Sequence, residues 1–284
     1  MTLCLTEKEA IKLWNAMTDN SFSPSLMGIL NITPDSFFDQ GRYAPLEKAL
    51  RRAMQIYEEG ASILDIGGES TRPGSNPVTV EEEIERIKPV LQALYQRNYP
   101  LPISIDTRNP ATAQVALDLG AQLINDVSGA LHPAMRKLAV QYKVDLCIMH
   151  MLGNPKTMQI SPIYSEGVIP YLLRWFESRI TLLVQDGIDR TKIILDPGIG
   201  FGKRATDNME IYKNLSHLKA HFGLRMMIGG SHKSFMRTIC EKENLLSATL
   251  IMHTIAAIQK IDILRVHNIG EHSDLAKLVH AYLH

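Results

Sequence analysis

Short apolar runs recur eight times along this chain, and nearly every run ends in a polar residue. The runs cover 26–31, 62–66, 102–106, 122–126, 144–150, 191–196, 225–229 and 262–267. They carry few polar residues before their last position, as expected for strands of a parallel sheet that is covered on its outer face. The polar residues at or just beyond their ends are Asn31, Asp65, Asp106, Asn125 with Asp126, His150, Asp196, Lys233, and Arg265 with His267.

Helical stretches follow these runs, near 45–59, 80–97, 109–119, 131–142, 167–186, 207–221, 244–260 and 272–283. This alternation predicts an α/β protein of the (β/α)8 TIM-barrel class. An open, doubly wound sheet is the competing layout, but there the functional residues gather at one switch point, whereas here they end almost every run. Because barrel active sites are built from the C-terminal ends of several strands, we expect these polar residues to converge on one mouth.

Two parts of the chain are distinguished: residues 1–24 as a short N-terminal helical extension, and residues 25–284 as the barrel. Thr6 and Glu9 form a T-x-x-E capping box, and Ile11, Trp14 and Met17 fall on one side of the helix that follows. We expect this helix to pack against the outside of the barrel.

Charge and cysteine content restrict the partners of the protein. Lys and Arg together number 30, as do Asp and Glu, so no net charge would attract nucleic acid or an acidic membrane surface. The three cysteines include no CxxC pair, which argues against a disulfide framework and fits a reducing compartment. No apolar run reaches the roughly 18 residues of a membrane span, and no secretory signal is evident. A cytoplasmic protein that binds neither nucleic acid nor membranes is expected.

Two loops, at 32–44 and 67–79, are longer than the roughly two to six residues usual for connections from strand to helix. Long loops on the catalytic face often act as lids. The first follows Asn31 and contains Asp35, an amide and a carboxylate that suit Mg²⁺, although such side chains can also hold a turn. The second contains Thr71 and Arg72, whose hydroxyl and guanidinium donors suit phosphate oxygens.

Three hydrogen-bond acceptors, Asp106, Asn125 and Asp196, end strands of the predicted barrel. A flat ring with several N–H donors, such as an aminopyrimidinone, needs acceptors of this kind. Met149 would add a soft apolar wall. Each aspartate taken singly could instead cap the helix after its strand. Three acceptors in one ring of strand ends favour a ligand site.

Anion-binding features accompany these acceptors. Lys233 and Ser234 stand where a helix is expected to begin, a suitable place for a carboxylate or phosphate. Arg265 and His267 share one side of the last strand and could hold a second anion. The glycine-rich segment 196–203 matches neither GxGxxG with a following acid nor GxxxxGK[ST], so it indicates neither a dinucleotide site nor a Walker A loop.

Taken together, these motifs resemble the dihydropteroate synthase family, folate-pathway enzymes with a pterin-binding TIM barrel. The resemblance runs from about Met27 to His267 and is carried by MGILNITPDSF, GGESTRPG, SIDTR, INDVSG, MHMLGNPKTMQ, LDPGIGFGK, SHKSF and RVHN. It implies a transferase that condenses hydroxymethyl-dihydropterin diphosphate with p-aminobenzoate, giving dihydropteroate and diphosphate, with Mg²⁺ as cofactor. It also implies a homodimer and a sulfonamide target.

The resemblance assigns roles by position. Pterin binding falls to Asp106, Asn125, Met149, Asp196, Lys233 and Arg265. Diphosphate binding falls to Asn31, Thr71, Arg265 and His267, with Asn31 also holding the metal. The aminobenzoate pocket comprises Phe37, Thr71, Arg72, Pro73, Phe201, Lys233 and Ser234. The catalytic set is Asp35, Asp106, Asp196, Lys233 and Arg265.

The mechanism that the resemblance implies is dissociative, or SN1-like. Diphosphate leaves first, and the positive charge on the pterin methylene spreads into the ring. Buried carboxylates favour such a cation because water is excluded from the site. The neutral aniline nitrogen then attacks with its own lone pair.

The chain departs from the usual family pattern at a few positions. His232 and Asn268 replace Arg and Asp, Phe38 and Gln40 replace Ser and Gly in the first loop, and Ile199 replaces Phe. These changes leave the pterin set intact and predict altered affinity on the aminobenzoate side. Two other functions stay open: a corrinoid-linked methyltransferase, which resembles the chain at the pterin acceptors only, and a pterin-binding module without turnover.

Overall fold

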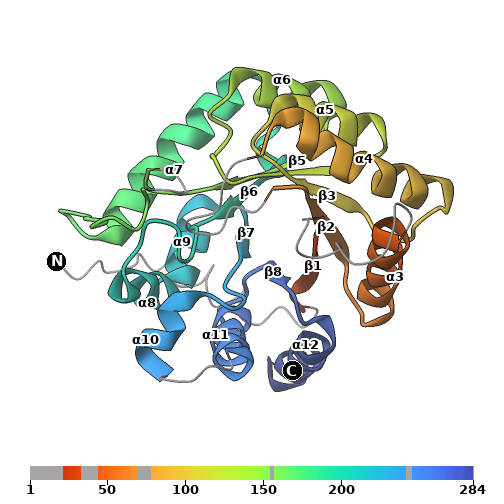
Figure 1. Cartoon of the computed structure of the whole chain (residues 1–284). Helices are drawn as coiled ribbons and strands as arrows, with labels where there is room; N and C mark the ends of the chain where they lie inside the picture. The colour runs from red at the N-terminus through yellow and green to blue at the C-terminus, as the bar shows by residue number, and fades with distance from the viewer. Residues whose placement is uncertain (1–21, 33–43, 70–77, 154–156, 241–244, 284) are drawn as a thin grey trace.

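A closed parallel barrel forms the body of the protein (Figure 1). The computed structural model describes residues 22–32, 44–69, 78–153, 157–240 and 245–283. Within these residues the strands pair in chain order and β8 pairs with β1, as the (β/α)8 prediction requires. The strands are β1 (Ser25–Asn31), β2 (Ile63–Gly67), β3 (Ile103–Asp106), β4 (Leu123–Asp126), β5 (Asp145–Met149), β6 (Ile193–Asp196), β7 (Arg225–Ile228) and β8 (Ile263–Val266).

Helices form the outer layer around these strands (Figure 1). They are α3 (Ala44–Glu58), α4 (Val80–Gln96), α5 (Pro110–Asp118), α6 (Pro133–Tyr142), α7 (Val168–Gln185), α8 (Ala205–Lys213), α9 (Leu215–Phe222), α10 (Arg237–Cys240), α11 (Leu246–Ile258) and α12 (Ile269–Leu283), with 3-10 turns η1 (Arg190–Lys192) and η2 (Ser234–Met236). None of the described helices combines the length and apolarity needed to cross a membrane.

One predicted helix is wrong in its continuity. The stretch 207–221 is split at Asn214 into α8 and α9. The Asn214 side-chain amide donates to the backbone carbonyl of Glu210, 2.8 Å away. Asparagine bonds of this kind compete with the regular helical ladder, which explains the break.

Two apolar layers build the core of the barrel. The larger lies between the strands and the surrounding helices, with fully buried residues such as Leu64, Ile105 and Phe176. The smaller fills the inside of the barrel with residues from nearly every strand, namely Met27, Ile63, Leu123, Cys147, Ile194, Met227 and Ile263. Cys147 is therefore a buried residue of the apolar core. This inner layer forms the floor on which the polar strand ends stand.

The N-terminal extension is left untested. Residues 1–21 lie outside the described part of the chain, so the predicted helix after Thr6 stays a prediction.

Candidate active site

A polar layer lies directly above the apolar floor of the barrel. Side chains alternate between the two faces of a strand, so residues two positions beyond the floor also point inward. At those positions the strands carry Asp65, Asn125, Met149, Asp196 and Arg265, and Asp106 of β3 joins them through its contact with Arg265. The predicted convergence of polar strand-end residues on one mouth is thus confirmed for Asp65, Asp106, Asn125, Asp196 and Arg265.

Arg265 lies at the centre of this layer. Its Nε donates to Oδ2 of Asp65 and its Nη2 donates to Oδ2 of Asp106, each over 2.6 Å. The Asn125 amide also donates to Oδ2 of Asp65, at 3.2 Å. Asp65 is fully buried and Asp106 nearly so, which makes these charge-assisted contacts strong. The network therefore joins β2, β3, β4 and β8 across the barrel mouth.

Asp65 is a central residue for which the sequence analysis gave no role. It was recognised only as the polar residue of its run, and nothing local to β2 separates it from a structural aspartate. Its importance comes from Arg265, which is 200 residues away in the sequence. The pairing of β1 with both β2 and β8 brings the two residues together.

Two carboxylate oxygens of this network have no partner among the described residues. They are Oδ1 of Asp65 and Oδ1 of Asp106, both buried. An unpaired buried acceptor is costly, so such atoms indicate a ligand that donates hydrogen bonds. Burial raises the pKa of Asp106 to about 7, against the opposing effect of Arg265. The site therefore offers acceptors to N–H groups of a bound ring.

Asp196 supplies an acceptor from β6. Its Oδ1 accepts from the backbone N–H of Gly198 at 2.7 Å, and burial raises its pKa while that bond and Lys233 oppose the rise. Gly198 has a φ of +71°, and a Cβ there would lie 2.0 Å from the His150 carbonyl oxygen. Only glycine fits this close approach, so the turn after β6 is built to present Asp196.

Lys233 and Phe201 form the next part of the site. The Lys233 ammonium lies 4.0 Å from the centroid of the Phe201 ring, a cation–π contact. Gly200 leaves room for the lysine stem, since a Cβ there would lie 3.1 Å from Lys233 Cδ. Phe201 also packs in one apolar cluster with Met149 and Met158. The structure thus groups Lys233, Phe201 and Met149, as the assigned pterin and aminobenzoate roles require.

Lys203 contacts the backbone next to this region, and its sequence position had indicated no role. Its buried ammonium donates to Nδ1 of His150 at 2.9 Å, the His150 carbonyl at 3.2 Å and the Phe201 carbonyl at 3.1 Å. Burial lowers its pKa to about 7, whereas Asp196 opposes the fall. Three acceptors match the three N–H bonds of the charged form, so we assign an ammonium here. It ties the end of β5 to the loop after β6.

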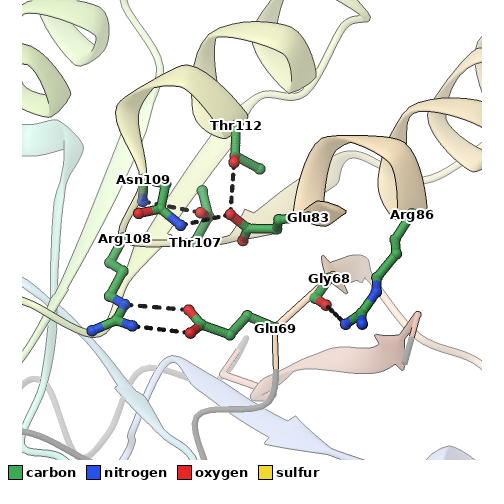
Figure 2. A network of polar contacts seen from close by, with 8 residues as sticks. All are labelled: Gly68, Glu69, Glu83, Arg86, Thr107, Arg108, Asn109 and Thr112. Atoms are coloured by element: carbon green, nitrogen blue, oxygen red, sulfur yellow. Dashed lines mark hydrogen bonds and ion pairs between the residues drawn. The ribbon is translucent and has the colours of Figure 1, made fainter. Parts of the chain in front are cut away.

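The base of the second long loop is fixed by a polar network (Figure 2). Arg108 binds Glu69 through two parallel hydrogen bonds of 3.2 and 2.9 Å. Arg86 donates to the Gly68 carbonyl at 2.7 Å. Buried Glu83, in the first turn of α4, accepts from Asn109 at 2.7 Å and from the Thr112 hydroxyl at 2.6 Å. The contacts join the end of β2 to α4 and to the end of β3.

Replacing Arg108 with methionine should destabilise the protein by about 1–3 kcal/mol, because Glu69 is almost fully buried and would lose its charged partner. Urea unfolding measures this loss. Arg97→Met is the matched control, since its contact with Glu47 is exposed and should contribute less than about 1 kcal/mol. Equal effects of the two substitutions would contradict the importance of the Glu69–Arg108 pair.

The segments after β7 and β8 contact each other at the rim. His267 lies with its Nδ1 3.0 Å from the Ser231 hydroxyl. His232 and Asn268, two positions where the chain departs from the family pattern, are partners: His232 Nε2 lies 2.8 Å from Asn268 Oδ1. The two departures therefore contact each other in this chain. Lys233 and Ser234 follow directly, so the segment that carries them is anchored to β8.

The helix expected at Ser234 is only a 3-10 turn, η2, followed by the four residues of α10. A helix this short has a small dipole, so a carboxylate would rely on the Ser234 hydroxyl and Lys233.

Several predicted residues cannot be placed. Asp35, Phe37, Phe38, Gln40, Thr71, Arg72 and Pro73 lie outside the described residues. Asn31 is described: it ends β1, pairs with Gly67 of β2 and is half-buried at the mouth. Among the described residues, no group of three His, Cys, Asp or Glu side chains could hold a metal ion.

Comparisons with known proteins agree with this geometry. A family model described as "Pterin binding enzyme" matches residues 27–267. Dihydropteroate synthase from Escherichia coli (strain K12) is 40% identical over 262 residues, which is 92% of this chain and 92% of that protein.

Two solved structures are also similar. The Yersinia pestis dihydropteroate synthase, in a complex with a sulfonamide drug, has a TM-score of 0.84 and 38% identity, covering 92% of this chain and 94% of that one. The Xanthomonas albilineans enzyme with 4-aminobenzoic acid has a TM-score of 0.84 and 34% identity, covering 92% and 93%. The match to the family model and to these relatives over most of the chain shows that this protein belongs to the dihydropteroate synthase family of pterin-binding enzymes.

Proposed function

We propose that this protein condenses hydroxymethyl-dihydropterin diphosphate with p-aminobenzoate to give dihydropteroate and diphosphate, a transferase step of folate biosynthesis. The observation that carries the proposal is the buried acceptor layer around Arg265, in a chain that belongs to a pterin-binding family. A pterin presents an aminopyrimidinone edge with several N–H donors. Asp106, Asn125 and Asp196 supply acceptors from β3, β4 and β6.

The diphosphate would bind at the rim, beside Asn31, His267 and Arg265, with Thr71 from the second loop. Magnesium fits this place by the chemistry of the donors: it commonly keeps several waters and binds through one or two protein oxygens together with substrate phosphates. The Asn31 amide oxygen would be that protein ligand, with Asp35 reaching in from the first loop. When bound, the ion would neutralise charge on the diphosphate.

The aminobenzoate would lie against Phe201, with its carboxylate near Ser234 and Lys233. Phe37, Arg72 and Pro73 would complete the pocket from the two long loops. Support comes from the Xanthomonas relative, whose structure holds 4-aminobenzoic acid, and from the Yersinia relative, whose structure holds a sulfonamide drug. We propose the same aryl site, and hence sulfonamide binding, for this chain.

The reaction we propose is dissociative. The bond between the pterin methylene and the diphosphate oxygen breaks first, and its electron pair leaves with the diphosphate. Asp106 and Asp196 stabilise the cation that remains, because carboxylates act strongly in a buried site. The aniline nitrogen then forms the new carbon–nitrogen bond and releases its proton to solvent.

Pterin affinity should fall as the pH is lowered through about 7, approaching tenfold per pH unit, because protonation removes the negative charge of Asp106 and turns one of its acceptor oxygens into a donor. The sign follows from the raised pKa: the carboxylate form, which binds, predominates only above it. Calorimetry with 6-hydroxymethylpterin across this range measures the effect. Asp106→Asn should remove the pH dependence; a wild-type affinity that is constant across this range would contradict the role of Asp106.

Two experiments separate the proposed reaction from pterin binding without turnover. Calorimetry with dihydropterin diphosphate reports binding, and a diphosphate-release assay with and without p-aminobenzoate reports turnover. The synthase should release diphosphate and form dihydropteroate when both substrates are present. Heat of binding without release would instead indicate a binding module.

A homodimer is also proposed, in a cytoplasmic setting. Its support is an exposed apolar surface on α11 and α12, formed by Ile251, Ile255, Ile258, Leu278 and Tyr282. Apolar groups gathered on neighbouring helices are common at subunit interfaces.

A further inference from the structure

Two buried histidines that the proposed reaction does not use lie behind the rim of the site. His253 is on α11 and His272 is on α12, and both are fully buried. Nδ1 of His253 lies 2.9 Å from Nε2 of His272. Buried polar rings in direct contact must share a hydrogen atom, so one ring donates and the other accepts.

The direction of this hydrogen bond follows from the next contact. Nδ1 of His272 lies 2.5 Å from the backbone carbonyl oxygen of Asn268, which can only accept. Nδ1 of His272 therefore carries the hydrogen. Burial lowers the pKa of both rings, that of His253 to about 3, so each ring is neutral and has a single N–H. His272 Nε2 then accepts from His253 Nδ1, which leaves His253 Nε2 as a bare acceptor.

The His253 end of this hydrogen-bond chain faces the segment that follows β7. Neither His253 Nε2 nor the Tyr212 hydroxyl of α8 has a hydrogen-bond partner among the described residues. Both atoms lie against Gly230: a Cβ there would be 2.9 Å from His253 Nε2 and 2.3 Å from the Tyr212 oxygen. The two atoms do not bond to each other directly, but the hydroxyl is a donor and the bare nitrogen an acceptor, so one buried water between them could accept from the first and donate to the second.

This hydrogen-bond chain connects the segments after β7 and β8, which both carry residues at the rim of the site. At one end, Asn268 follows His267 and its side chain binds His232. At the other end, Gly230 precedes Ser231, which contacts His267. His232 itself has a left-handed backbone, with a φ of +57°, a conformation that surrounding contacts must hold in a residue other than glycine.

We propose that His253 and His272 are positioning residues, which form a directional chain from Tyr212 to the Asn268 carbonyl and hold Gly230–Ser234 against His267. Lys233 and Ser234 thereby keep their positions relative to Arg265 and His267, where the diphosphate is proposed to bind. Besides Tyr212, the titratable groups that act on the pair are His232 and Glu271. The functional consequence rests on the proposed function, whereas the hydrogen-bond direction does not.

The direction is tested by long-range ¹⁵N–¹H NMR of the full-length protein labelled at its 10 histidines. The loss of signals in His253→Gln and His272→Gln assigns the two rings. Both wild-type rings should carry the hydrogen on Nδ1, the less common neutral form in water, and should stay neutral from about pH 6 to 8. A hydrogen on Nε2 of either ring, or a charged ring in this range, overturns the chain.

The positioning role is tested by kinetics of His272→Phe, which keeps a ring but removes both nitrogens. We expect the KM for p-aminobenzoate to rise about five- to tenfold, as for the loss of one net hydrogen bond. The Kd for 6-hydroxymethylpterin should rise less, by about twofold, since Lys233 is its one assigned contact on the displaced segment and Asp106, Asn125 and Asp196 are untouched. His217→Phe on α9 is the control and should change neither value.

The outcomes separate the two proposals. If both ligands weaken to the same extent, or neither does, the histidines are merely structural and the positioning role is wrong. If the wild-type protein binds pterin but shows no turnover, the proposed function fails, and the NMR result alone decides the hydrogen-bond chain. A His272→Phe protein that cannot fold would likewise overturn the specific role, because the pair would then be needed for the stability of the whole protein and not for the position of one segment.

Discussion

Asp106→Asn should weaken the binding of 6-hydroxymethylpterin at least about a hundredfold, or roughly 2.7 kcal/mol. Asp106 offers a buried oxygen without a partner, and its other oxygen accepts from Arg265 at 2.6 Å. A neutral amide loses the charge assistance, which contributes about 1.5–3 kcal/mol per hydrogen bond, and it turns an N–H group toward either Arg265 or the ligand. Isothermal calorimetry near neutral pH measures the change.

Asp145→Asn is the matched control for this substitution. Asp145 also pairs with an arginine, Arg225, but it begins strand β5 and therefore lies at the opposite end of the barrel. We expect its effect on pterin affinity to be negligible. Normal pterin binding by Asp106→Asn would show that the acceptor layer is not the pterin site.

Lys233→Ala should lower kcat/KM by roughly a thousandfold or more. The ammonium lies over Phe201 and acts on Asp196, so it stands between the proposed pterin and aminobenzoate positions. Preorganised charges in a water-excluded site commonly contribute about 10²–10³ in rate, and loss of substrate binding adds to this. The diphosphate-release assay with both substrates measures the loss.

Lys219→Ala is the control for charge removal. Lys219 pairs with Asp262 just before β8, at the end of the barrel away from the site. Its substitution should leave turnover near the wild-type rate. Full activity of Lys233→Ala would exclude Lys233 from the catalytic set.

The fold could be predicted because its determinants are local and repeated. Each strand is a short apolar run that ends in a polar residue, and each helix carries its own apolar face, so the period of the pattern alone separates the two. The split at Asn214 was missed because it depends on one side chain that turns back onto the Glu210 carbonyl. A periodic pattern contains no information about such a bond.

The site could be predicted only where a residue with a suitable side chain stands at the end of a strand. Asp106, Asn125 and Asp196 end their strands, and a barrel brings strand ends together whatever their separation along the chain. Asp65, Lys203 and the pair His253–His272 were not assigned roles, since each depends on a partner from a distant element. A buried lysine with three acceptors, for example, looks like any other lysine in the sequence.

A crystal structure with bound 6-hydroxymethylpterin tests the central claim most directly. The aminopyrimidinone edge should lie within hydrogen-bond distance of Asp106, Asn125 and Asp196, inside the mouth formed by the strand ends. A pterin bound elsewhere on the protein, or one that leaves these three side chains without contact, would contradict it.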